Sequence, residues 1–287
     1  MFQLLPALVL PYPQIDPVIF EIWGIAIRWY AIAYIAGILL GWWYAIRLVK
    51  TARLWTAWGG QPPLSAPQAD DFILWATLGI ILGGRIGYIL FYGFIYEPEL
   101  YSNPMVWLEI WKGGMSFHGG LIGVILAVIL FSIVKRLDMI RVGDVVASVV
   151  PIGLFTGRLA NFVNGELWGK PSDVPWAMVF PTGGDIPRHP SQLYEAALEG
   201  IVLFLILRFL ATRLKAFDRP GLITAAFLFF YGTFRIVGEM FRDSDQLIGD
   251  GAISMGQALS LAMLIGAAFF AWWAATHRAK HIDATPA

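Results

Sequence analysis

The sequence predicts an all-α integral membrane protein with seven transmembrane helices. The first indication is composition, because 58% of the 287 residues are hydrophobic and only 14% are charged, whereas ordinary soluble domains carry about 25% charged residues. The second indication is that the apolar residues gather into seven segments of about 17–25 residues, the length that a helix needs to cross a bilayer. We find no internal repeat and no second domain, so residues 1–287 are expected to form a single polytopic membrane domain.

The seven segments follow one another along the chain. Their approximate spans are 22–46, 72–92, 117–134, 142–163, 193–210, 222–239 and 253–275. Segment 51–68 between the first two is rich in glycine and proline and is expected to be an irregular loop. Segments 94–116 and 165–192 are long and rich in Trp, Tyr and Pro, so we expect them to lie on the membrane surface as periplasmic arms or short interfacial helices.

The distribution of lysine and arginine between the two sets of helix ends predicts the orientation. Eleven of these residues lie at one set of ends: Arg47, Lys50, Arg53, Lys135, Arg136, Arg141, Arg213, Lys215, Arg219, Arg278 and Lys280. Five lie at the opposite ends: Arg28, Lys112, Lys170, Arg188 and Arg242. Because cytoplasmic loops carry the positive excess, we expect a periplasmic N-terminus and a cytoplasmic C-terminus.

Small residues within the helices predict close packing and one irregular helix. Glycines recur every four residues in the first three helices, at Gly37 and Gly41, at Gly79, Gly83 and Gly87, and at Gly119 and Gly123. This spacing lets helices approach closely, so we interpret these glycines as packing positions. Pro151, Gly153 and Gly157 are expected to kink or open the fourth helix.

We single out three arginines within the predicted helices, where a charge costs at least about 2.5–3.5 kcal/mol and is commonly kept for pairing or function. The direction of each helix places Arg85, Arg158 and Arg235 in the outward half of the membrane. His118 begins the third helix from the same side, and Tyr30 lies in the outer half of the first helix. We therefore expect one polar centre in the outer leaflet.

Helical spacing brings further polar groups toward this centre. Arg158 and Asn161 are three residues apart and share a helix face. Tyr231, Arg235 and Glu239 form a stripe at positions i, i+4 and i+8.

The arginines favour an anion site over a metal site. A guanidinium group is a planar, permanently charged donor suited to phosphate, and no carboxylate cluster is apparent beside the three arginines. The chain has no cysteine, so we expect no thiolate metal site and no cysteine nucleophile. Without a metal-binding cluster we also expect no metal and no cofactor. In the alternative interpretation, ion pairs of Arg235 with Glu239 and of Arg158 with Glu166 only hold helices together.

His118 stands in the glycine-rich sequence GGMSFHGG. The ordinary imidazole pKa of about 6.5 suits a general base, and the neighbouring glycines leave room for a substrate. The alternative is an interfacial histidine whose ring is satisfied by a backbone carbonyl.

Most of these polar residues lie in five long motifs. The motifs are LGGRIGYILFY (82–92), GGMSFHGGLIG (113–123), GRLANFVNGELWG (157–169), RHPSQLYEAALEG (188–200) and YGTFRIVGEMFR (231–242). In this order they closely resemble the prolipoprotein diacylglyceryl transferase family of bacterial inner membranes. Members of that family have seven transmembrane helices with the N-terminus outside, in agreement with the orientation predicted from the charges.

The resemblance implies a reaction and its partners. The diacylglyceryl group of phosphatidylglycerol would be transferred to the lipobox cysteine thiol of a prolipoprotein signal peptide, forming a thioether and releasing glycerol phosphate. Membrane lipid would be a partner and nucleic acid would not. The family's catalytic positions correspond to His118, Arg158 and Arg235, and its substrate-binding positions to Tyr30, Asn161, Glu166, Gly169, Tyr231 and Glu239; Arg85 lies in a matching motif and is grouped with them.

Two other functions are compatible with arginines inside a membrane. A carrier or channel for an anion would need a path through the whole bilayer and often has internal repeats, whereas here the polar residues crowd into one half. Another enzyme that consumes phosphatidylglycerol could share the donor site and use a different acceptor.

Overall fold

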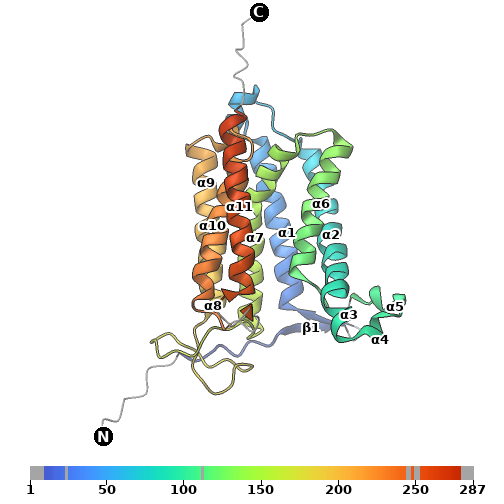
Figure 1. Cartoon of the computed structure of the whole chain (residues 1–287), viewed down its shortest axis with the longest axis vertical. Coiled ribbons are helices and arrows are strands. Elements are labelled where there is room, and N and C mark those ends of the chain that lie inside the picture. The colour runs from blue at the N-terminus through green and yellow to red at the C-terminus, as the bar shows by residue number, and fades with distance from the viewer. Residues whose placement is uncertain (1–9, 23–24, 111–112, 244–246, 249–252, 279–287) are drawn as a thin grey trace, which may run out of the picture.

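The computed structural model describes residues 10–22, 25–110, 113–243, 247–248 and 253–278. Its long helices run side by side, and the strand β1 lies at one end of the bundle while α11 ends at the other (Figure 1). We call these the head end and the tail end. Lys112 and Lys280, which contribute to the predicted orientation, lie outside the described residues.

Six helices of the described chain are long and apolar enough to cross a membrane. They are α1 (Trp29–Lys50), α2 (Ala66–Tyr88) with the π-helical stretch η3 (Ile89–Gly93), α6 (Phe117–Lys135), α7 (Met139–Val163), α10 (Leu222–Glu239) and α11 (Met255–Thr276). Many of their large apolar side chains are exposed, for example Leu82, Ile125 and Ile265. A bilayer would cover such surfaces, so the protein is a multi-pass membrane protein.

The fifth predicted span is helical but is not among these six. It consists of α8 (Ser191–Glu195), the π-helical stretch η5 (Ala196–Val202) and α9 (Leu203–Arg213). Glu195, Glu199 and Arg208 lower the hydropathy of the segment, and the π-helical stretch divides it.

The predicted start of the first helix at residue 22 is wrong. The structure has an antiparallel hairpin there, in which β1 (Val18–Ile22) pairs with β2 (Ile25–Arg28), and α1 begins only at Trp29. Val18, Ile19 and Ile27 are β-branched and favour a strand. An apolar run does not by itself distinguish a strand from a helix.

The second predicted helix begins earlier than expected, at Ala66 instead of 72. Ser65 and Gln68 form a capping box there, which satisfies backbone N–H groups of the first turn. The other short elements are η1 (Ala52–Leu54), η2 (Thr56–Trp58), α3 (Phe94–Tyr96), α4 (Pro98–Tyr101), α5 (Pro104–Trp107), η6 (Ala216–Asp218), β3 (Leu247–Ile248) and β4 (Ile253–Ser254). Short helices thus form in segment 94–116, as predicted.

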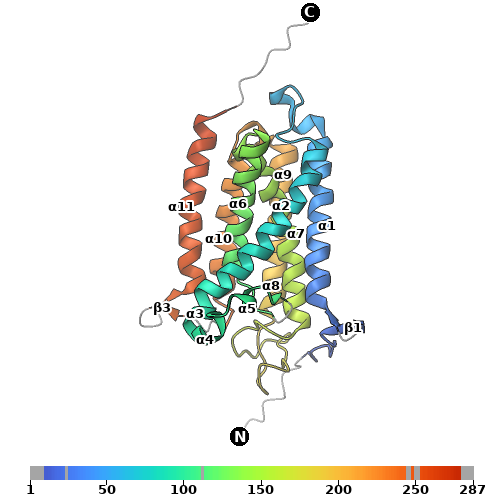
Figure 2. The same ribbon diagram turned by 90° about the vertical axis from the view of Figure 1, so that its right-hand side faces the viewer.

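Close contact between glycines joins α2 to α6. A Cβ atom on Gly83 would lie 2.4 Å from the carbonyl oxygen of Gly119, and one on Gly79 would lie 2.5 Å from that of Gly123. The two backbones touch, which confirms the interpretation of these glycines as packing positions. Figure 2 shows α2 and α6 crossing in the foreground.

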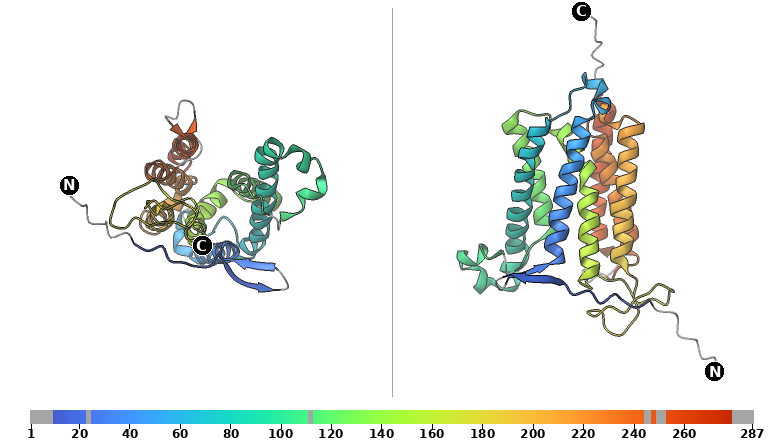
Figure 3. Two further views of the ribbon diagram at one scale, coloured as in Figure 1. Left: turned by 90° about the horizontal axis from the view of Figure 1, so that it is seen from below. Right: turned by 180° about the vertical axis from the view of Figure 1, so that it is seen from behind.

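Helix α7 has the central place in the bundle. It contacts α1, α6, α9, η5 and α10. Seen from below, α2 and α6 lie on one side of α7, and α10 and α11 lie on the other (Figure 3). A hydrophobic core that includes the fully buried side chains of Trp55, Phe217 and Ile223 lies toward the tail end. The polar residues predicted to be functional lie mainly at the head end, away from this core.

Candidate functional site

Two arginines from different helices share a pair of carboxylates at the head end. Arg158 of α7 has Nε 3.0 Å from Glu195 Oε2 and Nη2 3.1 Å from Glu199 Oε2. Arg235 of α10 has Nη1 2.6 Å from Glu195 Oε1 and 3.8 Å from Glu199 Oε1. The two predicted catalytic arginines are thus brought together by acids that the sequence interpretation did not include.

Glu195 and Glu199 are almost completely buried, with side-chain exposures of 1% and 0%. Glu195 ends α8, and Glu199 lies in the π-helical stretch η5. The prediction that no carboxylate cluster stands beside the arginines is wrong. The sequence signal that could have revealed the cluster is a pair of glutamates four residues apart inside an apolar segment. Acids buried in such a segment need partners, which here are the arginines.

Two further residues complete this group. Glu239 Oε1 pairs with Arg235 Nη2 one helical turn away, so the predicted ion pair between these residues is present. Arg242 Nη1 lies 3.5 Å from Glu195 Oε1. Burial lowers the pKa of Arg242, and the charge of Glu195 opposes that effect. We refer to the six residues Arg158, Arg235, Arg242, Glu195, Glu199 and Glu239 as the arginine–glutamate centre.

Glu166 belongs to a separate hydrogen-bonded group. Its carboxylate accepts hydrogen bonds from the hydroxyl of Tyr30 and, at 2.9 Å, from Asn161 Nδ2, which also donates to Tyr30. The backbone carbonyl of Glu166 accepts from Gln192 Nε2 at 2.6 Å. The predicted ion pair of Glu166 with Arg158 is therefore wrong, and Glu166 instead ties α1 to the end of α7.

Gly169 is required by close backbone packing. A Cβ atom at this position would lie 2.5 Å from the carbonyl oxygen of Phe241 and 2.7 Å from that of His189. The Gly169 N–H donates to the His189 carbonyl at 2.8 Å. Gly169 thus lets the head-end loop approach the chain that follows α10, and a direct contact with substrate is not needed to explain it.

Tyr231 lies one turn before Arg235 on α10 and is buried. Its ring stacks on Phe227 with the centroids 5.6 Å apart. The predicted stripe on α10 therefore runs from this buried phenol to the ion pair of Arg235 with Glu239.

The fourth predicted helix, α7, is not opened at the predicted place, and another helical segment of the site is irregular. Helix α7 continues without interruption past Pro151, from Met139 to Val163. The irregular backbone lies instead in η5, which carries Glu199 and packs against α7. Isolated π-helical turns are frequent at functional sites, so the distortion marks the same place as the buried charges.

Arg85 does not join the arginine–glutamate centre through any contact between the described residues. Its three guanidinium nitrogens donate to backbone carbonyls: Nε to Trp107 at 3.0 Å, Nη2 to Val106 at 2.6 Å, and Nη1 to Gly113 at 2.7 Å and Gly114 at 3.1 Å. These contacts favour a role in holding the arm 94–116 over the predicted role in binding substrate.

Replacing Arg85 by lysine tests this interpretation. A single ammonium group cannot reach four carbonyls on both sides of the arm, and each buried acceptor left unpaired costs about 1–3 kcal/mol. We expect limited proteolysis within residues 97–110 to become faster than in the unchanged protein. An unchanged digestion pattern together with a raised KM for the phospholipid would contradict our interpretation and favour phosphate binding by Arg85.

His118 is the second residue of α6 and is half-buried. Its ring meets Phe117 edge-on, with the centroids 5.7 Å apart. No hydrogen bond joins it to another residue of the described chain, so its imidazole nitrogens are not occupied by the carbonyl that the alternative interpretation requires. The structure does not bring it into contact with the arginine–glutamate centre.

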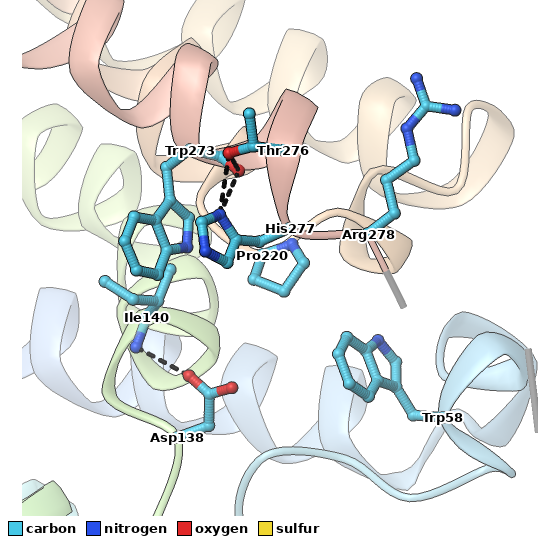
Figure 4. A pocket seen from close by; sticks show the side chains of 8 residues that line it. All are labelled: Trp58, Asp138, Ile140, Pro220, Trp273, Thr276, His277 and Arg278. Carbon is cyan, nitrogen blue, oxygen red and sulfur yellow. Dashed lines mark hydrogen bonds between the residues drawn. The ribbon is translucent and has the colours of Figure 1, made fainter. Parts of the chain in front are cut away.

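Two pockets of about 340 Å³ each lie at opposite ends of the bundle. The head-end pocket is apolar and is lined by Val174, Trp176, His189, Tyr194, Leu198, Gly238 and Phe241. The tail-end pocket is lined by Trp58, Asp138, Ile140, Pro220, Trp273, Thr276, His277 and Arg278 (Figure 4). None of the predicted site residues lines either pocket. We associate function with the head end because the paired charges of Arg158, Arg235 and Glu239 lie there.

His189 shapes the head-end pocket. Its Nδ1 lies 3.1 Å from the hydroxyl of Tyr194, and its ring meets Phe241 with the centroids 5.3 Å apart. Burial lowers the pKa of His189, so its imidazole is mainly neutral at and above neutral pH.

The described residues contain no group of three or more His, Cys, Asp or Glu arranged to hold a metal ion.

Known proteins resemble this chain over most of its length. Residues 17–273 match the family described as prolipoprotein diacylglyceryl transferase. A phosphatidylglycerol–prolipoprotein diacylglyceryl transferase of Rhizobium meliloti (strain 1021) is 54% identical over 260 residues, which cover 90% of this chain and 91% of the relative. The protein of the same name from Nitrobacter winogradskyi is 52% identical over 286 residues, which cover 97% and 96% of the two chains.

Proposed function

Because the chain belongs to the prolipoprotein diacylglyceryl transferase family, we propose that its arginine–glutamate centre holds the phosphate of phosphatidylglycerol. The protein is a transferase that moves the diacylglyceryl group of this lipid to a prolipoprotein. The observation that carries the assignment of the site is the convergence of Arg158 and Arg235 on one buried point. Guanidinium groups suit phosphate oxygens in number and geometry of donors.

The chemical step that we propose is a displacement at the glyceryl carbon. The acceptor is the thiol of a lipobox cysteine; as it loses its proton, an S–C bond forms and the C–O bond to phosphate breaks. The electron pair of that bond leaves with glycerol phosphate. Arg158 and Arg235 would stabilise the charge that develops on the departing oxygen, which is the kind of preorganised electrostatic contact that accelerates such reactions most.

The head end would face the periplasm of a bacterial inner membrane. In this arrangement segment 191–213, the fifth span in chain order, would bring the number of membrane spans to seven. The N-terminus would be periplasmic and the C-terminus cytoplasmic. The basic residues described at the tail end, such as Arg47, Arg136 and Arg219, support this orientation. Substrate lipid in the outer leaflet and a secreted prolipoprotein would then reach the centre from the same side.

The absence of native cysteine allows a direct test of this orientation. Ser102 lies exposed at the head end and Thr56 lies exposed near the tail end. We expect a membrane-impermeant maleimide to label Ser102→Cys in intact spheroplasts, and Thr56→Cys only after permeabilisation. The reverse pattern would refute the proposed orientation.

The transfer itself is measured with purified protein, phosphatidylglycerol labelled in its acyl chains, and a lipobox peptide. We expect the label in the peptide, and none when serine replaces the peptide's cysteine. If the enzyme used a different acceptor, phosphatidylglycerol would be consumed while both peptides stayed unlabelled. Movement of an anion across vesicles without labelling of the peptide would favour a carrier.

A further inference from the structure

The charges of the arginine–glutamate centre balance one another before a substrate is bound. The three positive charges belong to Arg158, Arg235 and Arg242, and the three negative charges to Glu195, Glu199 and Glu239. The phosphate of phosphatidylglycerol carries one further negative charge. It would therefore enter a buried site in which the six described residues of the arginine–glutamate centre supply no excess of positive charge.

A buried carboxylate that loses its arginine partner strongly destabilises the protein, because its charge is left uncompensated away from water. Ionisable groups in such surroundings generally become neutral by gaining or losing a proton. If phosphate takes over a guanidinium group, the carboxylate it displaces is thus expected to accept a proton.

The geometry distinguishes Glu199 from the other two glutamates. Three arginines hold Glu195, and Arg235 holds Glu239 within one turn of α10. Glu199 Oε2 accepts from Arg158 at 3.1 Å. Its Oε1 accepts no hydrogen bond from the described residues and lies 3.8 Å from Arg235 Nη1. Glu195 Oε2 likewise accepts no hydrogen bond from the described residues, but it lies 3.0 Å from Arg158 Nε. Glu199 Oε1 can therefore gain a proton without displacing a hydrogen bond or a close ion pair.

We propose that Glu199 takes up one proton when the phosphate of phosphatidylglycerol replaces it at Arg158, and releases that proton when the phosphate product leaves. This inference rests on the transferase function proposed above. The step forms and later breaks only the O–H bond of the carboxyl group, and the proton comes from and returns to water. The charged and titratable groups that face Glu199 are Glu195 from its own helical segment, Arg158 from α7, and Tyr231 and Arg235 from α10.

The substitution Glu199→Gln tests the proposal, because glutamine has nearly the same shape and needs no proton. Uptake of one proton on binding means that affinity falls as pH rises, by up to about tenfold per pH unit. We expect KM for phosphatidylglycerol to rise in this way from about pH 6 to about pH 8 in the unchanged protein. In Glu199→Gln we expect a KM that is independent of pH, whatever the change in kcat.

Asp144→Asn is the matched control. Asp144 is another buried carboxylate, but it accepts from Gly221 N at 2.7 Å and from Thr224 N and Oγ1 at 2.8 Å, at the tail end of the bundle. Its replacement should lower the temperature of unfolding because a buried hydrogen-bond network is weakened. The pH dependence of KM should stay that of the unchanged protein, because no contact joins Asp144 to the described residues of the arginine–glutamate centre.

Proton uptake can also be measured directly, without any variant. Detergent-solubilised protein is mixed in weakly buffered solution with phosphatidylglycerol or with diacylglycerol, which lacks the phosphate. We expect about one proton taken up per bound phosphatidylglycerol, none with diacylglycerol, and none with Glu199→Gln.

The possible results separate the inference from the proposed function. Binding of phosphatidylglycerol without proton uptake would overturn the role of Glu199, even if Glu199→Gln failed to fold. Parallel rises of KM with pH in Glu199→Gln and the unchanged protein would overturn it as well. If the unchanged protein labelled no lipobox peptide, the proposed function would fail instead.

Discussion

Replacing Arg158 by alanine is expected to lower kcat of diacylglyceryl transfer by about 10²- to 10³-fold, the usual loss when one preorganised donor to a developing anion is removed. Arg158 is the arginine that contacts both Glu195 and Glu199 from α7, at 3.0 and 3.1 Å. Its Nε and Nη2 can therefore turn from carboxylate oxygens to phosphate oxygens without leaving the site. The rate is measured with labelled phosphatidylglycerol and a lipobox peptide at saturating lipid.

Loss of stability has to be separated from loss of chemistry in this variant. Alanine at 158 leaves Glu199 without its hydrogen-bonding partner, and breaking a buried pair costs about 3–5 kcal/mol of unfolding free energy. The double variant Arg158→Ala/Glu199→Gln removes both charges, so we expect it to unfold at a higher temperature than the single variant and still be inactive. Recovery of transfer in the double variant would show that Arg158 only neutralises Glu199.

Arg158→Lys gives a finer comparison. Lysine keeps the positive charge and loses the planar, forked arrangement of donors. A rate between those of the alanine variant and the unchanged protein would show that charge and geometry both contribute. Equal rates for the lysine and alanine variants would assign the effect to geometry.

The sequence was sufficient to predict the helical membrane fold, since six of the apolar segments of bilayer length are long helices in the described structure. It was not sufficient at the N-terminal hairpin, because the apolar, β-branched residues of 18–28 suit a strand as well as a helix. It also did not predict the π-helical stretch of the site. Proline suggested α7, whereas the distortion lies in η5, which contains no proline.

Prediction of the site had a similar limit. Arg158 and Arg235 were correctly predicted to lie in one polar centre, because a charged residue in an apolar helix needs a partner. Their actual partners, Glu195 and Glu199, lie on a third segment and could be recognised only by asking what balances each charge. Arg85 satisfies the same rule in another way, since backbone carbonyls of the arm accept its hydrogen bonds. Sequence alone does not distinguish pairing with an acid from pairing with the backbone.

His118 remains the predicted general base for the acceptor thiol. The structure leaves its imidazole without a hydrogen-bonding partner among the described residues, at the head end where a peptide would arrive. A thiol of ordinary pKa, about 8.5, is only about 3% ionised at pH 7 and about three quarters ionised at pH 9. A base is therefore needed near neutral pH and much less needed in alkaline solution.

We expect His118→Gln to lower kcat by about 10²-fold or more at pH 7, within the usual contribution of a general base. Because ionisation of the thiol itself increases roughly 25-fold from pH 7 to pH 9, the defect should shrink by about that factor at pH 9. His189→Gln is the matched control: burial lowers the pKa of His189, so this residue is neutral at both pH values and its replacement should have the same effect at each. A defect of His118→Gln that does not change with pH would contradict proton abstraction and assign His118 to positioning of the substrate.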